Sequence, residues 1–208
     1  MSEYWNVEWK DATVSEYKKY INPNGRPKFF DIFKEYNIRY VCDAACGFGA
    51  YSVMLNNNGF HTAGFDVSEN SVNLTKSMLL HFNCPNDEYK VCNITDIDFD
   101  DEIFDAVVAH AVIDHLSVND AKKALEELYR ITKKNGLIYL SFDGIEGDDI
   151  SLEHQVLEDG SFLYHDESRN GLLFKYYLEK DINNLIIGRN KVYYNITSKG
   201  DREVIIKK

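Results

Sequence analysis

Between a predicted strand at 38–43 and a predicted helix at 50–58, the chain reads Val41-Cys-Asp-Ala-Ala-Cys-Gly-Phe-Gly49. Glycines at such a junction let the backbone approach a ligand closely and adopt positive φ. The helix that follows directs its free N–H groups at the same space. The next predicted strand ends on Asp66, whose carboxylate can accept hydrogen bonds from both ribose hydroxyls of an adenosine-containing ligand. The combination predicts a nucleotide-type binding site.

Outward from this segment, strand and helix patterns alternate through residue 142. Such alternation is typical of an α/β fold, with a parallel sheet, helices on both faces and right-handed crossovers. A late helix and a terminal antiparallel hairpin follow this part of the chain. The predicted strands are 38–43, 61–66, 89–93, 104–109, 137–142, 190–197 and 202–207, and the predicted helices include 50–58, 68–82, one that Ser117 caps and Gly136 closes, and 178–187.

The length of 208 residues fits a single domain, 1–208, in four parts. Residues 1–37 form an N-terminal helical segment, and residues 38–142 form the cofactor-binding core. Residues 143–177 contain short alternating runs between turn signals, which predict a small antiparallel β insertion that serves as a lid, a dimer contact or a solvated face. Residues 178–208 supply the final helix and hairpin.

Charge and composition restrict the partners. The net charge is −11, which argues against duplex nucleic acid and against an anionic membrane surface. Residues 143–177 carry nine Asp and Glu against one Arg and one Lys, so the insertion holds −7 of that charge. We expect it to disfavour anionic substrates, with a solvated acidic face as the simpler alternative. The chain shows no signal peptide, no membrane span and no zinc-type cysteine spacing, which predicts a cytoplasmic protein with reduced thiols.

The glycine turn is compatible with two kinds of cofactor. A dinucleotide site prefers a third glycine three residues beyond the second, and Ser52 stands there. The acidic Asp43 at the start of the turn suits a cationic ligand better than a pyrophosphate. S-adenosylmethionine carries an ammonium and a sulfonium and no phosphate. A nicotinamide-dependent oxidoreductase stays open as the alternative.

The chain resembles the class I S-adenosylmethionine-dependent methyltransferases over residues 38–142. Val41–Gly49 is similar to their first motif, and Gly64-Phe-Asp-Val-Ser68 resembles the acidic motif of their second strand. Asn93–Asp105, Phe104–His110 and Leu125–Gly136 resemble the later motifs in the same order. The resemblance implies a Rossmann-like methyltransferase fold, in which the terminal antiparallel hairpin joins a mostly parallel seven-stranded sheet. It also implies S-adenosyl-L-methionine as cofactor. A protein that binds this cofactor without turnover is a further alternative.

The resemblance also implies roles for single residues. Ala45 stands where the family has its first glycine, and Asn93 replaces the acid that holds the adenine amino group. Asp66 would hold the ribose, and Asn93 with the Ile94 backbone N–H would bind the adenine edge. The implied cofactor-binding residues are Asp43, Ala44, Ala45, Cys46, Gly47, Gly49, Asp66, Val67, Asn93, Ile94, Ala109 and His110.

His110 and His115, beyond the fourth predicted strand, are the candidate catalytic residues. For His115 the alternative is packing under the next helix, and Asp114 is expected to be solvated. We expect no metal site, because the ligand spacing matches no known pattern. The acceptor is predicted to be a small molecule, and the protein a monomer or homodimer. A second candidate for the substrate wall is a set of N-terminal aromatic residues, Tyr4, Trp5, Trp9, Tyr17 and Tyr20.

Overall fold

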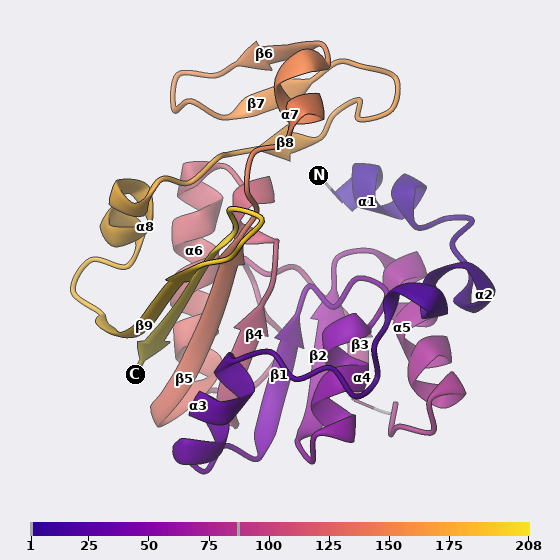
Figure 1. Ribbon diagram of the computed structural model, residues 1–208, viewed down its shortest axis with the longest axis vertical. Coiled ribbons are helices and arrows are strands. Elements are labelled where there is room, and N and C mark those ends of the chain that lie inside the picture. Colours follow the sequence, from indigo (N-terminus) through magenta and orange to yellow (C-terminus); the bar gives the residue numbers. More distant parts are fainter. Residues whose placement is uncertain (1, 87) are drawn as a thin grey trace.

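The computed structural model describes residues 2–86 and 88–208, and its centre is a seven-stranded sheet in the order β3-β2-β1-β4-β5-β10-β9 (Figure 1). The first five strands pair in parallel, while β10 is antiparallel to both β5 and β9. The predicted fold class is therefore confirmed. The strands are β1 Tyr40–Ala44, β2 His61–Asp66, β3 Tyr89–Val91, β4 Phe104–Ala109, β5 Thr132–Phe142, β9 Asn190–Ile196 and β10 Arg202–Lys207.

Helices cover both faces of the sheet because successive strand residues point to opposite sides. Val41 packs with α3 (Phe29–Glu35) and α4 (Ala50–Asn57), and Phe29 stacks on Tyr139 at 3.9 Å between ring centroids. Cys42 faces the opposite layer, which is formed by α6 (Val118–Ile131) and α8 (Glu179–Leu185). A further helix, α5 (Glu69–His81), packs on β2, β3 and α4.

The start of α6 agrees with the sequence prediction and its end does not. The Ser117 hydroxyl accepts a hydrogen bond from the Asp120 N–H at 3.1 Å, as an N-cap does. The helix ends at Ile131, so the expected closure at Gly136 is wrong. The last helical carbonyls, those of Arg130 and Ile131, accept hydrogen bonds from the segment before β4, and the chain continues directly into β5. Contacts from a distant segment thus terminate the helix.

Two segments lie beyond the arrowheads of β1 and β4 (Figure 1). One is the N-terminal segment with α1 (Ser2–Glu8), α2 (Val14–Tyr17) and a 3-10 turn at Lys18–Tyr20, after which the chain returns to the opposite end of the sheet and forms α3. The other is the insertion, whose β6 (His154–Val156), β7 (Phe162–Tyr164) and β8 (Leu173–Phe174) form a separate antiparallel sheet. A short helix, α7 (Gly147–Ser151), precedes β6 and was not predicted. Among the described residues, no helix combines the length and apolar character needed to cross a bilayer.

Candidate active site

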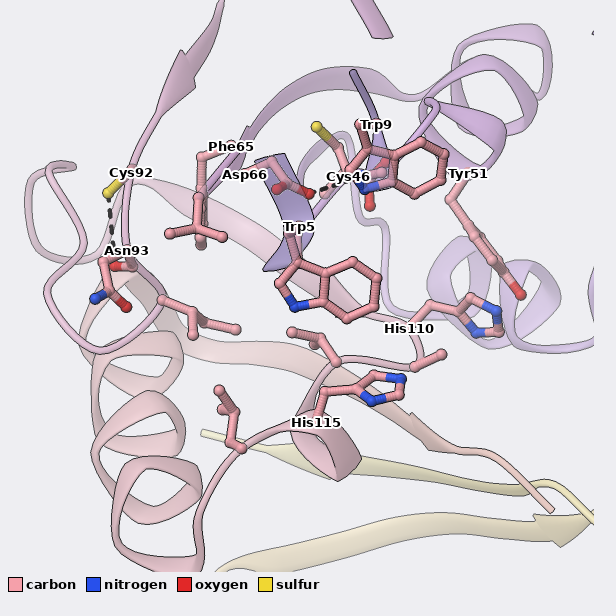
Figure 2. Close-up of a pocket in the computed structure, with 18 of the residues that line it drawn as sticks. Trp5, Trp9, Cys46, Tyr51, Phe65, Asp66, Cys92, Asn93, His110 and His115 are labelled. Carbon is pink, nitrogen blue, oxygen red and sulfur yellow. Dashed lines mark hydrogen bonds between the residues drawn. The ribbon is translucent and has the colours of Figure 1, made fainter. Parts of the chain in front are cut away.

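A cavity of about 600 Å³ lies where β1 to β4 end, beneath the N-terminal segment (Figure 2). Parallel α/β sheets place ligands at this edge because the carboxyl ends of the strands and the helix N-termini meet there. The volume lies within the range of about 300–1,000 Å³ that is typical of small-molecule sites. Its lining comprises Trp5, Trp9, Asp43, Ala45, Cys46, Gly47, Phe48, Ala50, Tyr51, Phe65, Asp66, Val67, Cys92, Asn93, Ile94, Thr95, His110, Ala111, Val112, His115, Leu116 and Asp120.

The glycine turn is held by its neighbours on β2 and α5. Gly47 has φ +54°, a left-handed conformation that favours glycine. Its N–H donates to the Asp66 carboxylate at 3.0 Å, and its carbonyl accepts from the Ser71 and Thr75 hydroxyls at 2.7 and 2.8 Å. The other Asp66 oxygen accepts from the Ser68 N–H at 2.9 Å. Asp66 therefore joins the turn to the end of β2 and still borders the cavity.

Asp43, at the end of β1, is a buried carboxylate that also borders the cavity. The Ser52 hydroxyl donates to it at 2.5 Å, which explains the serine where a dinucleotide site has glycine. Burial raises the pKa of Asp43 to about 6, and the nearby charge of Asp66 adds to the shift. A bound cation would favour the ionised form.

Asn93 lies after β3 at the side of the cavity near Phe65 and Cys92 (Figure 2), and the next residue, Ile94, also lines the cavity. The Asn93 side-chain oxygen accepts hydrogen bonds from the Thr95 N–H and hydroxyl, both at 3.0 Å. This oxygen is therefore already engaged within its own loop. A contact from it to an adenine amino group would share or replace those bonds.

His110 lies at the end of β4 and is exposed to the cavity. Its Nδ1 forms a 2.6 Å hydrogen bond with the Ser141 hydroxyl, and its ring lies 4.5 Å from that of Tyr51. The cavity lies inside the protein, so the surrounding protein atoms limit hydration of the ring and lower the pKa of His110 below its ordinary value of 6.5. The imidazole is therefore predominantly neutral at pH 7, as a proton acceptor must be.

His115 borders the same cavity from the 3-10 turn Ile113–His115. Its Nδ1 lies 3.0 Å from the Leu173 carbonyl, to which only a protonated Nδ1 can donate. In the neutral ring, Nε2 then keeps a free lone pair. Trp5 packs edge-on against the His115 ring at 5.2 Å, so the N-terminal helix and the insertion meet at this residue (Figure 2).

The burial of Asp114 differs from what the sequence predicted. The side chain has 0% exposure, whereas we expected it to be solvated. One of its oxygens accepts from the Asp143 N–H at 2.8 Å, and its backbone carbonyl accepts from the Lys175 N–H at 2.7 Å. Burial and the neighbouring Asp114 charge raise the pKa of the Asp143 carboxyl to about 6. The end of β5 and the segment after β8 cover a residue that sequence alone suggested was exposed.

Most of the predicted site residues border the cavity, but Ala44, Gly49 and Ala109 do not. Ala44 and Ala109 are fully buried strand residues, and Gly49, with φ +84°, packs against Thr75 instead. Of the five N-terminal aromatic residues, only Trp5 and Trp9 reach the cavity. The sequence analysis missed several lining residues, although each follows a predicted strand or begins a predicted helix, and residues at such positions border the site in this fold. They are Phe48, Ala50, Tyr51, Thr95, Ala111, Val112 and Leu116.

Residues 42–140 match the family model described as a methyltransferase domain. These residues contain β2, β3, β4 and most of β1, together with the glycine turn and Asp66. This segment, just under half of the chain, is similar to methyltransferase domains. The resemblance of the motifs is thereby confirmed, and the methyltransferase fold also explains the position of the cavity.

The curated relatives share only part of their length with this chain. An Arabidopsis thaliana tRNA (carboxymethyluridine(34)-5-O)-methyltransferase is 32% identical over 113 residues, 54% of this chain and 26% of that protein. The chain spans about a quarter to a half of the length of the curated relatives it matches.

Two solved structures share the fold. A protein from Pyrococcus horikoshii matches 93% of this chain and 98% of its own length, with 19% identity and a TM-score of 0.73. The 1,6-didemethyltoxoflavin-N1-methyltransferase of Burkholderia thailandensis, solved with S-adenosylhomocysteine, matches 96% of this chain and 80% of its own, with 13% identity and a TM-score of 0.66. At these identities the likeness concerns the fold alone.

Proposed function

We propose that the protein transfers a methyl group from S-adenosylmethionine to a small-molecule acceptor. The observation that carries this proposal is the pairing of Asp66 with the Gly47 N–H at the edge of the cavity. Asp66 would hold the ribose, the turn at Gly47 would adjoin the methionine portion, and buried Asp43 would favour its ammonium. Phe65 and Ile94 offer apolar surface for the adenine.

The remaining half of the cavity supports a small acceptor without negative charge. It is lined by Trp5, Tyr51, His110 and His115, and none of the described lining residues is Lys or Arg. A tRNA acceptor, as in the Arabidopsis relative, would bring phosphates that require basic side chains. The net charge of −11 also disfavours a tRNA acceptor. The oligomeric state and the cytoplasmic location stay predictions from the sequence.

The sulfonium makes its methyl group electrophilic, so the protein's main tasks are alignment and exclusion of water. Trp5 and Trp9 lie over the cavity and shield it (Figure 2). His110, neutral at pH 7, can accept the proton of an acceptor that arrives protonated. An acceptor with a free lone pair needs no base.

Calorimetry and product analysis test the proposal. We expect S-adenosylhomocysteine to bind in the micromolar range and NAD not to bind, which would also remove the oxidoreductase alternative. Methyl-labelled S-adenosylmethionine, incubated with small amines, phenols and carboxylates and separately with tRNA, should label the small molecules only. Labelling of tRNA alone would refute the acceptor class, and binding without turnover of any acceptor would favour the non-catalytic alternative.

Affinity for S-adenosylhomocysteine should depend on pH through Asp43. Its raised pKa of about 6 means that the carboxyl becomes neutral as the pH falls below that value and no longer attracts the ligand's ammonium. We expect affinity to be about tenfold weaker at pH 5 than at pH 7. Asp43→Asn should bind weakly with a flat profile between these pH values. An unchanged slope in that variant would assign the dependence to another group.

Replacing His110 should lower turnover without weakening cofactor binding. For an acceptor that loses a proton, we expect His110→Asn to reduce kcat about 100-fold, with KM for S-adenosylmethionine unchanged. The wild-type rate should fall on the acid side, below the ordinary histidine pKa of 6.5, because protonated His110 accepts no proton. His81→Asn, an exposed histidine on α5, serves as the control. Wild-type kcat in the His110 variant would exclude a base at this position.

A further inference from the structure

Three metal-ligating side chains meet beside the cavity although the sequence separates them. One carboxylate oxygen of Asp114, one of Asp143 and a ring nitrogen of His115 all lie within 4.8 Å of one another. Asp114 and His115 belong to the turn after β4, while Asp143 follows β5. The hydrogen bond from the Asp143 N–H to Asp114 fixes the two segments against each other.

Asp114 supplies an independent sign that a ligand is required. Its side chain has 0% exposure, and Oδ1 has no hydrogen-bond partner among residues 2–86 and 88–208. A carboxylate oxygen buried in this way is unfavourable unless a cation or a donor meets it. The buried Tyr177 hydroxyl likewise has no partner in the described part of the chain, and its burial and the nearby Asp114 charge both raise its pKa. An ion or a water molecule would satisfy these groups.

The charge around Asp114 favours an ion. Within the described residues, neither Asp114 nor Asp143 forms an ion pair with a Lys or Arg side chain. Lys175 is adjacent in space, but its ammonium donates to the Asp159 carbonyl. Asp201 adds further negative charge near Asp143. An imidazole coordinates a metal in its neutral form, so two ionised carboxylates match the charge of one divalent cation.

We propose that Asp114, His115 and Asp143 bind a divalent transition-metal cation. Imidazole together with carboxylate selects ions such as Mn²⁺, Fe²⁺ or Zn²⁺ over Ca²⁺ and Mg²⁺, which prefer oxygen ligands alone. Ligand atoms about 2.1 Å from an ion lie about 3–4 Å apart, so small side-chain movements close the site. Because His115 Nδ1 hydrogen-bonds to the Leu173 carbonyl, Nε2 would be the ligand atom, and such a hydrogen bond from the other ring nitrogen is typical of metal-binding histidines.

The position of the ion gives it a role in acceptor binding. Three protein ligands leave coordination positions open, and His115 borders the acceptor half of the cavity. The ion would therefore hold an oxygen or nitrogen of the acceptor and orient it. This role, unlike the metal site itself, rests on the proposed methyl transfer. In it His115 is a ligand, which leaves His110 as the candidate proton acceptor.

The test uses Mn²⁺ and the full chain after removal of bound metals with a chelator. Mn²⁺ is chosen because it binds cysteine thiols weakly, and its electron paramagnetic resonance signal in solution disappears on binding. We expect one equivalent to bind, and Asp114→Asn and Asp143→Asn each to weaken binding at least tenfold. Asp148→Asn, an exposed acid in the same segment, should bind like the wild type.

Each variant is also titrated with S-adenosylhomocysteine, because neither Asp114 nor Asp143 lines the cavity. Unchanged affinity would show that the variants fold. Absence of Mn²⁺ binding to the wild type, or equal binding by wild type and both variants, would overturn the metal site and leave water as the occupant. Failure of S-adenosylhomocysteine to bind while Mn²⁺ binds would refute the proposed function and leave the metal site standing.

Discussion

Asp66→Ala is expected to weaken the binding of S-adenosylhomocysteine at least 100-fold. The change removes a charged acceptor for two ribose hydroxyls, and such hydrogen bonds contribute about 1.5–3 kcal/mol each. It also frees the Gly47 N–H, which donates to Asp66 at 3.0 Å. Isothermal titration calorimetry at pH 7.5 measures the loss, and circular dichroism checks the fold.

Two matched variants separate the ribose contact from the shape of the turn. Ser71→Ala removes the 2.7 Å hydrogen bond to the Gly47 carbonyl but keeps the carboxylate, so a loss of less than tenfold is expected. Asp100→Ala removes an exposed acid from the loop before β4 and should leave binding unchanged. If Ser71→Ala weakened binding as much as Asp66→Ala, the carboxylate would act by positioning the turn.

Leu128→Ala should lower the free energy of unfolding by about 2–5 kcal/mol. Leu128 lies on the buried face of α6, has 0% exposure and packs in the core layer between this helix and the sheet. Truncation leaves a cavity that the rigid sheet below cannot close. Urea unfolding followed by circular dichroism gives the change, with an unchanged m-value as the check for two-state behaviour.

Leu80 provides the control for Leu128. It is also a helical leucine, on α5, but 69% of its surface is exposed. Leu80→Ala should therefore change the free energy of unfolding by less than about 0.5 kcal/mol. Equal effects of the two substitutions would mean that α6 does not pack on the sheet as described.

The α/β core could be predicted because its signals are local. Helical spacing of apolar residues identified α6, and a polar cap at Ser117 marked where it begins. The glycine turn and Asp66 stand next to strand ends, so their position followed once the strands were placed. The end of α6 was missed because hydrogen bonds from the segment before β4 terminate it, and these have no counterpart in the adjacent sequence.

Local sequence by itself determined the parallel core, the order in which strands and helices follow one another along the chain, and the ligand-binding edge. These features depend on periodicity and caps, which act over a few residues. Only the tertiary structure decided which side chains meet there. Trp5 reaches His115 across more than a hundred residues, and Asp143 reaches the buried Asp114 from the next strand of the sheet. Burial of a carboxylate depends on what folds over it, and no pattern around Asp114 in the chain carries that information.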